Sequence, residues 1–372
     1  MSITTCSKGV WELDQIYAKV NADRYVSYSN VNDPGTLWVW GQNGTGELGQ
    51  SNLIHKSSPI QIPGTQWNNV GGLYHTVATK TDGTLWAWGC NNIGQLGQSD
   101  LIHRSSPVQV PGTQWNQIDG GSHTIATKTD GTLWAWGGNS AGQLGNGTIS
   151  SRSSPVQIPG TQWNKISGTI ATKTDGTLWT WGDNFYGELG QNNTYHRSSP
   201  VQVPGTQWNQ ITRSHLHTVA TKTDGTLWAW GRNYQGQLGD GTVIFRSSPV
   251  QIPGTQWNQI GTGYEYTVAT KTDGTLWSWG YSNYGQLGVG TPGPPRSTPI
   301  QVPGTQWNQI TVGYRHTLAT KTDGTLWSWG ANLYGGLGDG TVISKSSPIQ
   351  VPGTQWKQIG GGMDRTVATK YY

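Results

Sequence analysis

Histidines in a repeated position are the first residues of this chain that suggest chemistry, because a ring of imidazoles can hold a metal ion. The chain has eight histidines. Four of them directly precede a threonine in one recurring position, and these are His75, His123, His217 and His316. Ile170, Tyr266 and Arg365 lie near the aligned position in other repeats, which leaves no complete ligand set. We therefore expect structural hydrogen bonds from these histidines to neighbouring loops, and no metal site.

A catalytic centre would need an acid, base or nucleophile that occurs once in the chain. The prominent aspartates instead recur in Asp-Gly pairs that are typical of turns. They are Asp82, Asp130, Asp175, Asp224, Asp273 and Asp323. Cys6 and Cys90 are far apart in sequence, and neither has an identifiable histidine partner. No phosphate-binding G-x-x-x-x-G-K-[ST] sequence is present. We predict that the protein is not an enzyme and has no catalytic residues and no cofactor.

Tryptophan could also carry function, since indole faces suit sugar binding, base stacking and light absorption. The chain has 22 tryptophans among 372 residues. Seven pairs lie in GTLWxWG sequences, and eight single tryptophans lie in PGTQWNQI or related sequences, which accounts for all of them. A residue that occupies the same position in every repeat fulfils a structural requirement that all repeats share. We therefore predict that the tryptophans pack one repeat against the next.

The repeats organise the whole chain. The first tryptophans of the seven pairs are separated by 48, 48, 45, 49, 49 and 50 residues. These tryptophans are Trp38, Trp86, Trp134, Trp179, Trp228, Trp277 and Trp327. We predict one domain over residues 1–372. Its repeat units are about 11–66, 67–114, 115–162, 163–207, 208–256, 257–306 and 307–355, with a closing half-unit at 356–372.

Each unit predicts short strands joined by tight turns. In HTVATKTDGTLWAWG, two apolar strands flank Asp82 and Gly83, which both tolerate the positive φ of a two-residue hairpin turn. Alternation places the two tryptophans on one face and Leu85 and Ala87 on the other, so both faces should be covered. The prolines of SSPVQVPG confine the next segment to an edge strand or an extended loop. The pattern predicts an all-β fold, a closed seven-bladed β-propeller with four-stranded blades.

We expect the two ends of the chain to meet in the first blade. The final segment, residues 356–370, repeats the first half of a unit and then stops. If it completes the first blade, the open sheet edge disappears and the ring closes. Residues 11–33 compete for the same place in this prediction.

Composition restricts the class of partner. Hydrophobic residues make up 33% of the chain, and the 55 glycines and 18 prolines favour strands and turns over helices. The formal charge of +4 arises from 23 basic and 19 acidic residues without a basic run, so we expect no specific nucleic acid and no membrane partner. The N-terminal sequence has no apolar core typical of a signal peptide, which predicts a cytoplasmic protein.

The unit from Asp224 to Gly254, DGTLWAWGRNYQGQLGDGTVIFRSSPVQIPG, resembles the repeat of the regulator of chromosome condensation family. That resemblance implies a seven-bladed β-propeller. The family includes a nucleotide-exchange factor for a small GTPase, an ultraviolet photoreceptor, an inhibitor of β-lactamases and many binding modules, so fold alone leaves function open. The exchange factor's inserted wedge has no counterpart among these units. Tyr74, Tyr264 and Tyr314 stand where the photoreceptor carries tryptophan, and only Arg315 and His316 match its motif.

The positions that vary between repeats carry the functional prediction, because the framework does not explain them. Aromatic and arginine residues in loops are typical of protein-binding surfaces. The predicted partner-binding residues precede the hairpin, and they are Tyr74, Arg213, His215, Tyr264, Glu265, Tyr314, Arg315, Asp364 and Arg365. A secondary set follows the WG sequence and consists of Tyr186, Tyr234, Tyr284 and Tyr334.

The sequence thus predicts a non-catalytic scaffold that binds a protein partner through variable loops on one face. A regulator of nucleotide exchange on a small GTPase is one alternative, and a dimeric light sensor is another. We expect a monomer, while a homodimer stays open.

Overall fold

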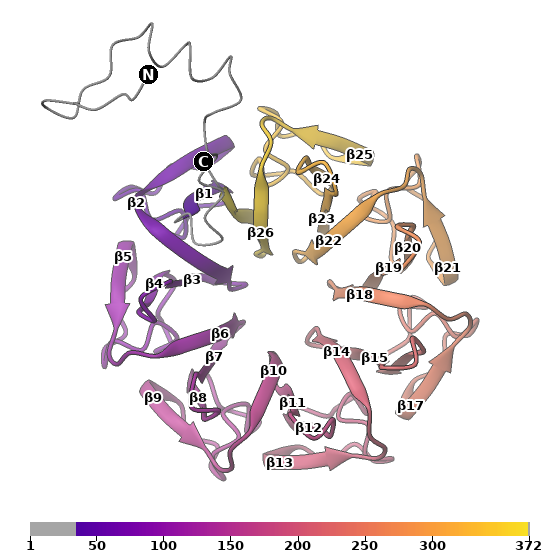
Figure 1. Ribbon diagram of the computed structural model, residues 1–372, viewed down its shortest axis with the longest axis horizontal. Helices are drawn as coiled ribbons and strands as arrows, with labels where there is room; N and C mark the ends of the chain where they lie inside the picture. Colours follow the sequence, from indigo (N-terminus) through magenta and orange to yellow (C-terminus); the bar gives the residue numbers. More distant parts are fainter. Residues whose placement is uncertain (1–34, 371–372) are drawn as a thin grey trace, which may run out of the picture. The chain divides into compact units, whose positions relative to one another are not determined.

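The computed structural model describes residues 35–370, and every regular element in that range is a β-strand (Figure 1). The strands form groups of four around a central axis, and within each group we number them from the axis outward. No helix among these residues is long and apolar enough to cross a membrane.

The strands fall into four concentric sets. The first strands, nearest the axis, are β6 (Trp115–Gly120), β10 (Trp163–Ser167), β14 (Trp208–Arg213), β18 (Trp257–Thr262), β22 (Trp307–Val312) and β26 (Trp356–Gly361). The second strands are β3 (His75–Lys80), β7 (His123–Lys128), β11 (Ile170–Lys173), β15 (His217–Lys222), β19 (Tyr266–Lys271), β23 (His316–Lys321) and β27 (Arg365–Lys370).

The third strands carry the tryptophan pairs, and the fourth strands form the outer rim. The third strands are β1 (Gly35–Gly41), β4 (Leu85–Gly89), β8 (Leu133–Gly137), β12 (Leu178–Gly182), β16 (Leu227–Gly231), β20 (Leu276–Gly280) and β24 (Leu326–Gly330). The fourth strands are β5 (Arg104–Val110), β9 (Arg152–Ile158), β13 (Arg197–Val203), β17 (Arg246–Ile252), β21 (Arg296–Val302) and β25 (Lys345–Val351).

One long strand, β2 (Lys56–Gly71), belongs to two blades. Its first half is the outer strand beside β1, with Leu37 opposite Ile62, and its second half is the first strand beside β3, with Val70 opposite Ala78. The seven-stranded sheet β26-β27-β1-β2-β3-β4-β5 therefore contains two blades, and five further four-stranded sheets bring the total to seven. The predicted seven-bladed propeller is confirmed.

The C-terminal segment completes the first blade, as predicted. Strand β27 pairs antiparallel with β1 from Thr36 opposite Lys370 to Gly41 opposite Arg365. Strands β26 and β27 fill the places for which residues 11–33 were considered a competitor. Residues 11–33 lie outside the described residues, as does the part of the first predicted unit that precedes residue 35.

The hairpin turn differs from the two-residue turn predicted from Asp82 and Gly83. Only Gly83 has a positive φ, of 79°. The Gly83 amide donates to the Lys80 carbonyl at 3.0 Å, and the Lys80 amide donates to the Thr84 carbonyl at 2.9 Å. The loop therefore has three residues and ends in a glycine bulge. Asp82 has a negative φ in this loop, and its carboxylate accepts hydrogen bonds from the amide and hydroxyl of Thr84, at 2.9 and 2.7 Å.

The core lies between blades, and the predicted alternation explains it. Leu85 and Ala87 are fully buried against Trp115 and Trp136 of the next blade. Trp88, on the other face of the same strand, is fully buried in the cluster shared with the preceding blade. Both faces of this blade are thus covered by neighbouring blades. This confirms the prediction that the tryptophans pack one repeat against the next.

A tryptophan hydrogen bond repeats at every seam between blades. The indole Nε1 of Trp279 donates to the carbonyl of Gln237 in the preceding blade at 2.9 Å. Trp40, Trp88, Trp136, Trp181, Trp230 and Trp329 make the same bond at 2.9–3.0 Å.

A glycine lets each indole approach this closely. At Gly239, two residues beyond the Gln237 carbonyl, φ is +80° and an added Cβ would lie 2.6 Å from the Trp279 Nε1. A side chain at this position would therefore be strained and would also collide with the indole.

The substitution Gly239→Ala is expected to lower the free energy of unfolding by about 2–5 kcal/mol, because it adds a left-handed backbone penalty to the collision with the indole. Gly290→Ala is the matched control, since Gly290 has a φ of +95° and open space around its Cβ position. The control should lose only the backbone contribution, about 1–2 kcal/mol. Urea unfolding of both variants tests this, and equal losses would contradict the close indole contact.

Candidate functional site

The loops whose sequences vary all emerge on one face of the ring. Because neighbouring strands of a blade are antiparallel, the loop between the first and second strands lies at the same end as the loop between the third and fourth. Backbone hydrogen bonds join the two loops of one blade, as between the Arg232 amide and the Leu216 carbonyl at 2.8 Å. We call this side the loop face. The opposite face carries the repeated Asp-Gly turns and PGTQ connections.

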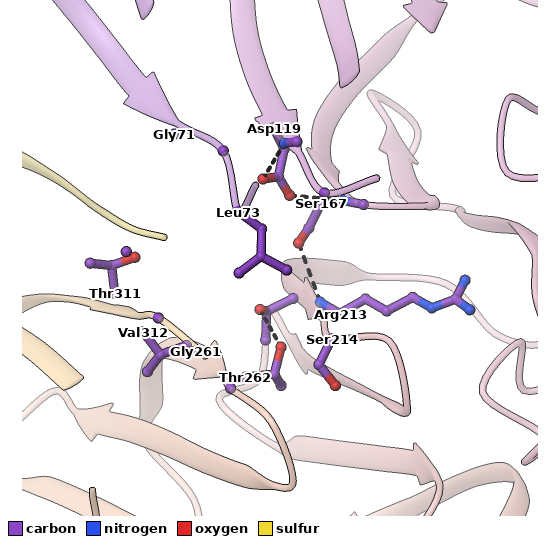
Figure 2. A pocket seen from close by; sticks show the side chains of 18 of the residues that line it. Gly71, Leu73, Asp119, Ser167, Arg213, Ser214, Gly261, Thr262, Thr311 and Val312 are labelled. Carbon is purple, nitrogen blue, oxygen red and sulfur yellow. Dashed lines mark hydrogen bonds between the residues drawn. The ribbon is translucent and has the colours of Figure 1, made fainter. Parts of the chain in front are cut away.

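A cavity of about 290 Å³ lies on the propeller axis and opens toward the loop face. The ends of the first strands of all seven blades line it. Ile118, Ile260, Ile310 and Ile359 contribute apolar surface to the wall. Figure 2 shows Leu73 projecting into this space, with Asp119 and Ser167 on one wall.

Aromatic rings lie at the loop-face end of this cavity, and they belong to four predicted partner-binding residues from different blades. The rings of Tyr264 and Tyr314 stack with centroids 4.4 Å apart and an interplanar angle of 22°. The rings of Tyr74 and His215 are 6.4 Å apart. Burial raises the pKa of Tyr314 to about 12, and the neighbouring Tyr264 adds to this increase. We call Tyr74, His215, Tyr264 and Tyr314 the channel mouth.

Charged residues flank the channel mouth. The guanidinium of Arg315 lies over the rings of Tyr284 and Tyr314, 4.9 and 5.1 Å from their centroids. Burial raises the pKa of the Asp364 carboxyl, while nearby Arg315 opposes this increase. Glu265 is nearly buried and forms an ion pair of 2.7 Å with Arg232. Arg315, Asp364 and Glu265 thus link the channel mouth to the surrounding loops.

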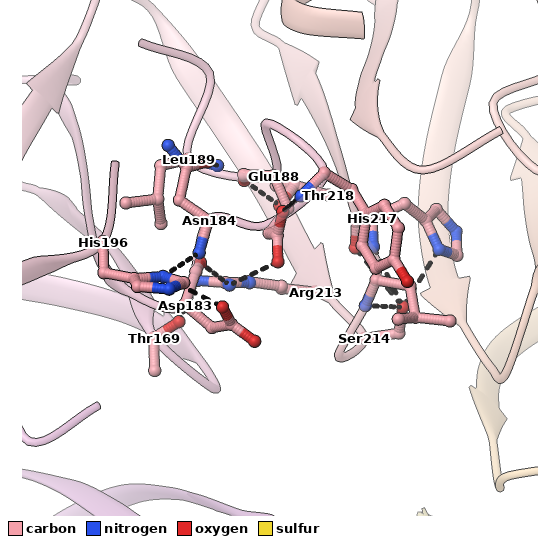
Figure 3. A network of polar contacts seen from close by, with 12 residues as sticks. Thr169, Asp183, Asn184, Glu188, Leu189, His196, Arg213, Ser214, His217 and Thr218 are labelled. Carbon is pink, nitrogen blue, oxygen red and sulfur yellow. Dashed lines mark hydrogen bonds and ion pairs between the residues drawn. The ribbon is translucent and has the colours of Figure 1, made fainter. Parts of the chain in front are cut away.

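Arg213, which we predicted as a partner-binding residue, is buried between two blades. Its side chain is only 5% exposed, and its guanidinium donates to the hydroxyl of Thr169 and to the carbonyls of Trp181 and Asp183, the latter two at 3.0 and 2.7 Å. These acceptors belong to the preceding blade, whose connection between the first and second strands is three or four residues shorter than in the other blades. As Figure 3 shows, Arg213 fills this place beside Glu188.

Arg365 is also buried, although we predicted it as a partner-binding residue. It is 1% exposed and takes the place that histidine holds in other blades. Its guanidinium donates to the hydroxyl of Thr76 at 3.0 Å and to the carbonyls of Leu73, Gly72 and His75 in the next blade. Burial lowers the pKa of Arg365 to about 10, so it stays protonated at neutral pH. Both arginines hold blades together.

A second aromatic cluster lies farther out on the loop face, over the fourth and fifth blades. Tyr186 contacts Phe185 and Phe245, with centroids 5.0 and 5.5 Å apart. The guanidinium of Arg232 lies 5.2 Å from the Tyr186 ring and 5.9 Å from the Tyr234 ring. Phe185 and Tyr234 are 68% and 67% exposed. We call Phe185, Tyr186, Arg232, Tyr234 and Phe245 the outer aromatic patch.

Comparison with known protein families identifies the repeated segments of this chain. Six successive segments match the model of the "Regulator of chromosome condensation (RCC1) repeat", at residues 82–126, 130–170, 175–221, 224–270, 273–320 and 323–369. The chain belongs to the RCC1 repeat family. A second model of the same repeat matches residues 257–286 and 307–335. The resemblance read from the repeat sequence is confirmed.

Solved RCC1-type propellers have the same fold. Human WBSCR16 superposes with a TM-score of 0.82 at 21% identity, covering 91% of this chain and 99% of that protein. Yeast RCC1 (Prp20), solved bound to Kap60, gives a TM-score of 0.81 at 20% identity, covering 91% and 89%. A second Prp20p structure from Saccharomyces cerevisiae gives the same TM-score and identity and covers 91% and 92%. Comparison with curated proteins found no significant match.

The RCC1-repeat scaffold thus divides the predicted residues into separate groups. Tyr186 and Tyr234 belong to the outer aromatic patch, whereas Tyr284 joins the channel mouth through Arg315. Tyr334 stands apart and packs against His55 at 5.0 Å. Phe185, Phe245 and Arg232 were not among the predicted site residues. Their positions differ from those of other repeats, but only the folded ring shows that they meet.

The four repeated histidines make structural hydrogen bonds to the next blade, but only His123 reaches a loop as expected, while the other three bond to threonines within strands. His217 is fully buried and lies 2.9 Å from the Thr267 hydroxyl of the next blade. His75 and His316 bond to threonines in the same way, and His123 bonds to the Gly168 carbonyl. Burial lowers the pKa to about 3 in His75 and His217 and to about 4 in His123 and His316. Among residues 35–370, no group of three or more His, Cys, Asp or Glu side chains is arranged to hold a metal ion.

These buried histidines predict acid sensitivity. Below the ordinary pKa of 6.5, a histidine binds a proton in the unfolded chain, while His217 in the folded protein stays neutral down to about pH 3. The contribution of each such histidine to stability is therefore fully present above pH 6.5 and falls as the pH decreases, by about 1.4 kcal/mol per pH unit. Chemical unfolding of His217→Gln between pH 6 and pH 4 should show a slope shallower by that amount. An unchanged slope would contradict the neutral state of His217.

Proposed function

We propose that this RCC1-repeat protein is a non-catalytic scaffold that binds a protein partner through its loop face. The outer aromatic patch is the observation that carries the proposal. Its exposed rings lie beside an arginine that is held by the buried Glu265. Aromatic residues and arginine dominate the energetics of protein interfaces, where a few anchors supply most of the affinity.

The framework does not require these aromatic side chains. The position of Phe185 is occupied by Gly44, Asn92 and Ser140 in the first three blades, and those blades have the same strand pairing. Large exposed rings at Phe185 and Tyr234 therefore add nothing that blade assembly needs. A function that uses them in contact with another molecule explains their presence.

The channel mouth supplies a second contact region of the same proposed surface. The ion pair between Arg232 and Glu265 connects the outer aromatic patch to the loop that also carries Tyr264. Yeast Prp20, which has this fold, was solved bound to Kap60 and was studied for its binding to Gsp1p and histones. This precedent supports protein binding only by analogy of fold.

The proposal predicts that a variant combining Phe185→Ala, Tyr234→Ala and Phe245→Ala loses a partner that the native protein retains. Loss of such anchors should weaken binding by about 2 kcal/mol or more, roughly thirtyfold. The measurement is affinity capture from the source lysate, followed by titration of the captured protein against both forms.

The matched control is Leu101→Ala with Ile102→Ala, which removes exposed apolar side chains, 59% and 63% exposed, from a loop of the second blade. A variant combining Tyr264→Ala, Tyr314→Ala and Arg315→Ala separates the contribution of the channel mouth. If the outer-patch variant and the control bind the partner equally well, the outer aromatic patch is not the contact surface.

A further inference from the structure

The cavity on the propeller axis holds a carboxylate without a counter-charge. Asp119, at the end of β6, accepts backbone hydrogen bonds from Gly120 and Gly168 at 2.7 and 2.8 Å. Within residues 35–370, none of the ion pairs includes Asp119. Its position on the cavity wall beside Ser167 is visible in Figure 2. Burial raises the pKa of Asp119, and the hydrogen bonds from Gly120, Gly168 and the Ser167 side chain oppose this increase.

The same cavity has an aromatic entrance. His215, Tyr264 and Tyr314 line it together with Asp119, although these residues come from four different blades. One side of Tyr314 is taken by the stacked Tyr264, and Arg315 also lies over its ring. In the part of the chain that the structure describes, Tyr264 has no other ring or cation contact. Tyr264 is partly exposed and lines the cavity.

The cations nearest the cavity are already committed elsewhere. Arg213 lines the wall, but its guanidinium points away from the cavity and is held by acceptors of the preceding blade (Figure 2). The positive charge of Arg315 is balanced by the nearby carboxylates of Asp364 and Glu265. His123 is neutral at physiological pH, since burial lowers its pKa to about 4. None of these groups neutralises Asp119.

We propose that this cavity binds an alkylammonium group, with Asp119 as the counter-charge and the aromatic rings of the channel mouth as the cage. A carboxylate combined with aromatic faces is a recognised environment for organic cations, and their attraction grows when water is excluded. The volume of about 290 Å³ suits one small cation or the end of one side chain. The ammonium group comes either from a free organic amine or from a lysine side chain that a protein partner inserts.

Calorimetric titration of the full-length protein tests this inference. The two probes are tetramethylammonium chloride and a lysine-containing peptide, with the same peptide carrying acetylated lysine as reference. The test variants are Asp119→Asn, which removes the charge but also replaces one of two accepting oxygens by an amide NH2, and Tyr264→Leu, which removes the aromatic face. Asp323→Asn, in an exposed turn of the opposite face, is the control.

We expect saturable binding of at least one probe to the native protein and to the control, and about tenfold weaker binding to each test variant. Binding of tetramethylammonium assigns the cavity to free amines. Binding of the lysine peptide alone, lost on acetylation, assigns it to a partner's side chain. If Asp119→Asn fails to fold, Tyr264→Leu decides alone.

The inference is overturned if neither probe binds the native protein, or if binding is equal in the native protein and in the folded variants. Because the outer aromatic patch is not involved, this outcome leaves the proposed scaffold function standing. Conversely, the cavity can bind a cation even if the outer-patch variant retains its protein partner.

Discussion

The hydrogen bond from an indole to the preceding blade is the constraint on which the rest of this propeller depends. It sets the distance between sheets at every seam, because the tryptophan Nε1 must reach a carbonyl while its ring covers a glycine. A buried N–H without an acceptor would cost more than the bond itself contributes, so the indole and the carbonyl fix one another. With seven such seams in a closed ring, no blade can shift without breaking a bond on each side.

This repetition explains why departures from the repeat are informative. The fourth blade has a shorter connection between its first and second strands, and there Arg213 of the fifth blade donates to the carbonyls of Trp181 and Asp183. At the first blade, Arg365 replaces a histidine and makes more bonds to its neighbour than the histidine makes elsewhere. Both arginines thus add hydrogen bonds between neighbouring blades. Exposed aromatic rings such as Phe185 do not alter these contacts.

The architecture could be predicted from the sequence because the same pattern of strands and turns occurs in seven successive units. Tandem GTLWxWG units define strands, turns and packing faces, and the half-unit at 356–370 shows where the ring closes. The hairpin was misjudged because Thr81 joins the loop, so that only Gly83 needs a positive φ. The sites were harder to predict. Arg213 and Arg365 have the residue type and loop position of contact residues, and only the neighbouring blade shows that they are buried. Asp119 was overlooked, although Gly, Ser or Thr occupies its position in the other blades, and only the closed ring shows that it lines the axial cavity.

Closure through the first blade also has a consequence for how the chain is made. Strand β1 is among the first described segments to be synthesised, whereas its partner β27 is the last, and the Thr36 hydroxyl finally meets the Lys370 carbonyl. Pairing across such a sequence separation is slow, since a long loop must close before the contact stabilises anything. During translation, the edge of β1 that pairs with β27 therefore stays unpaired while strands of nearly identical sequence are synthesised. The near-identity of the blades, which makes the finished ring regular, also makes a nascent chain susceptible to pairing with the wrong copy.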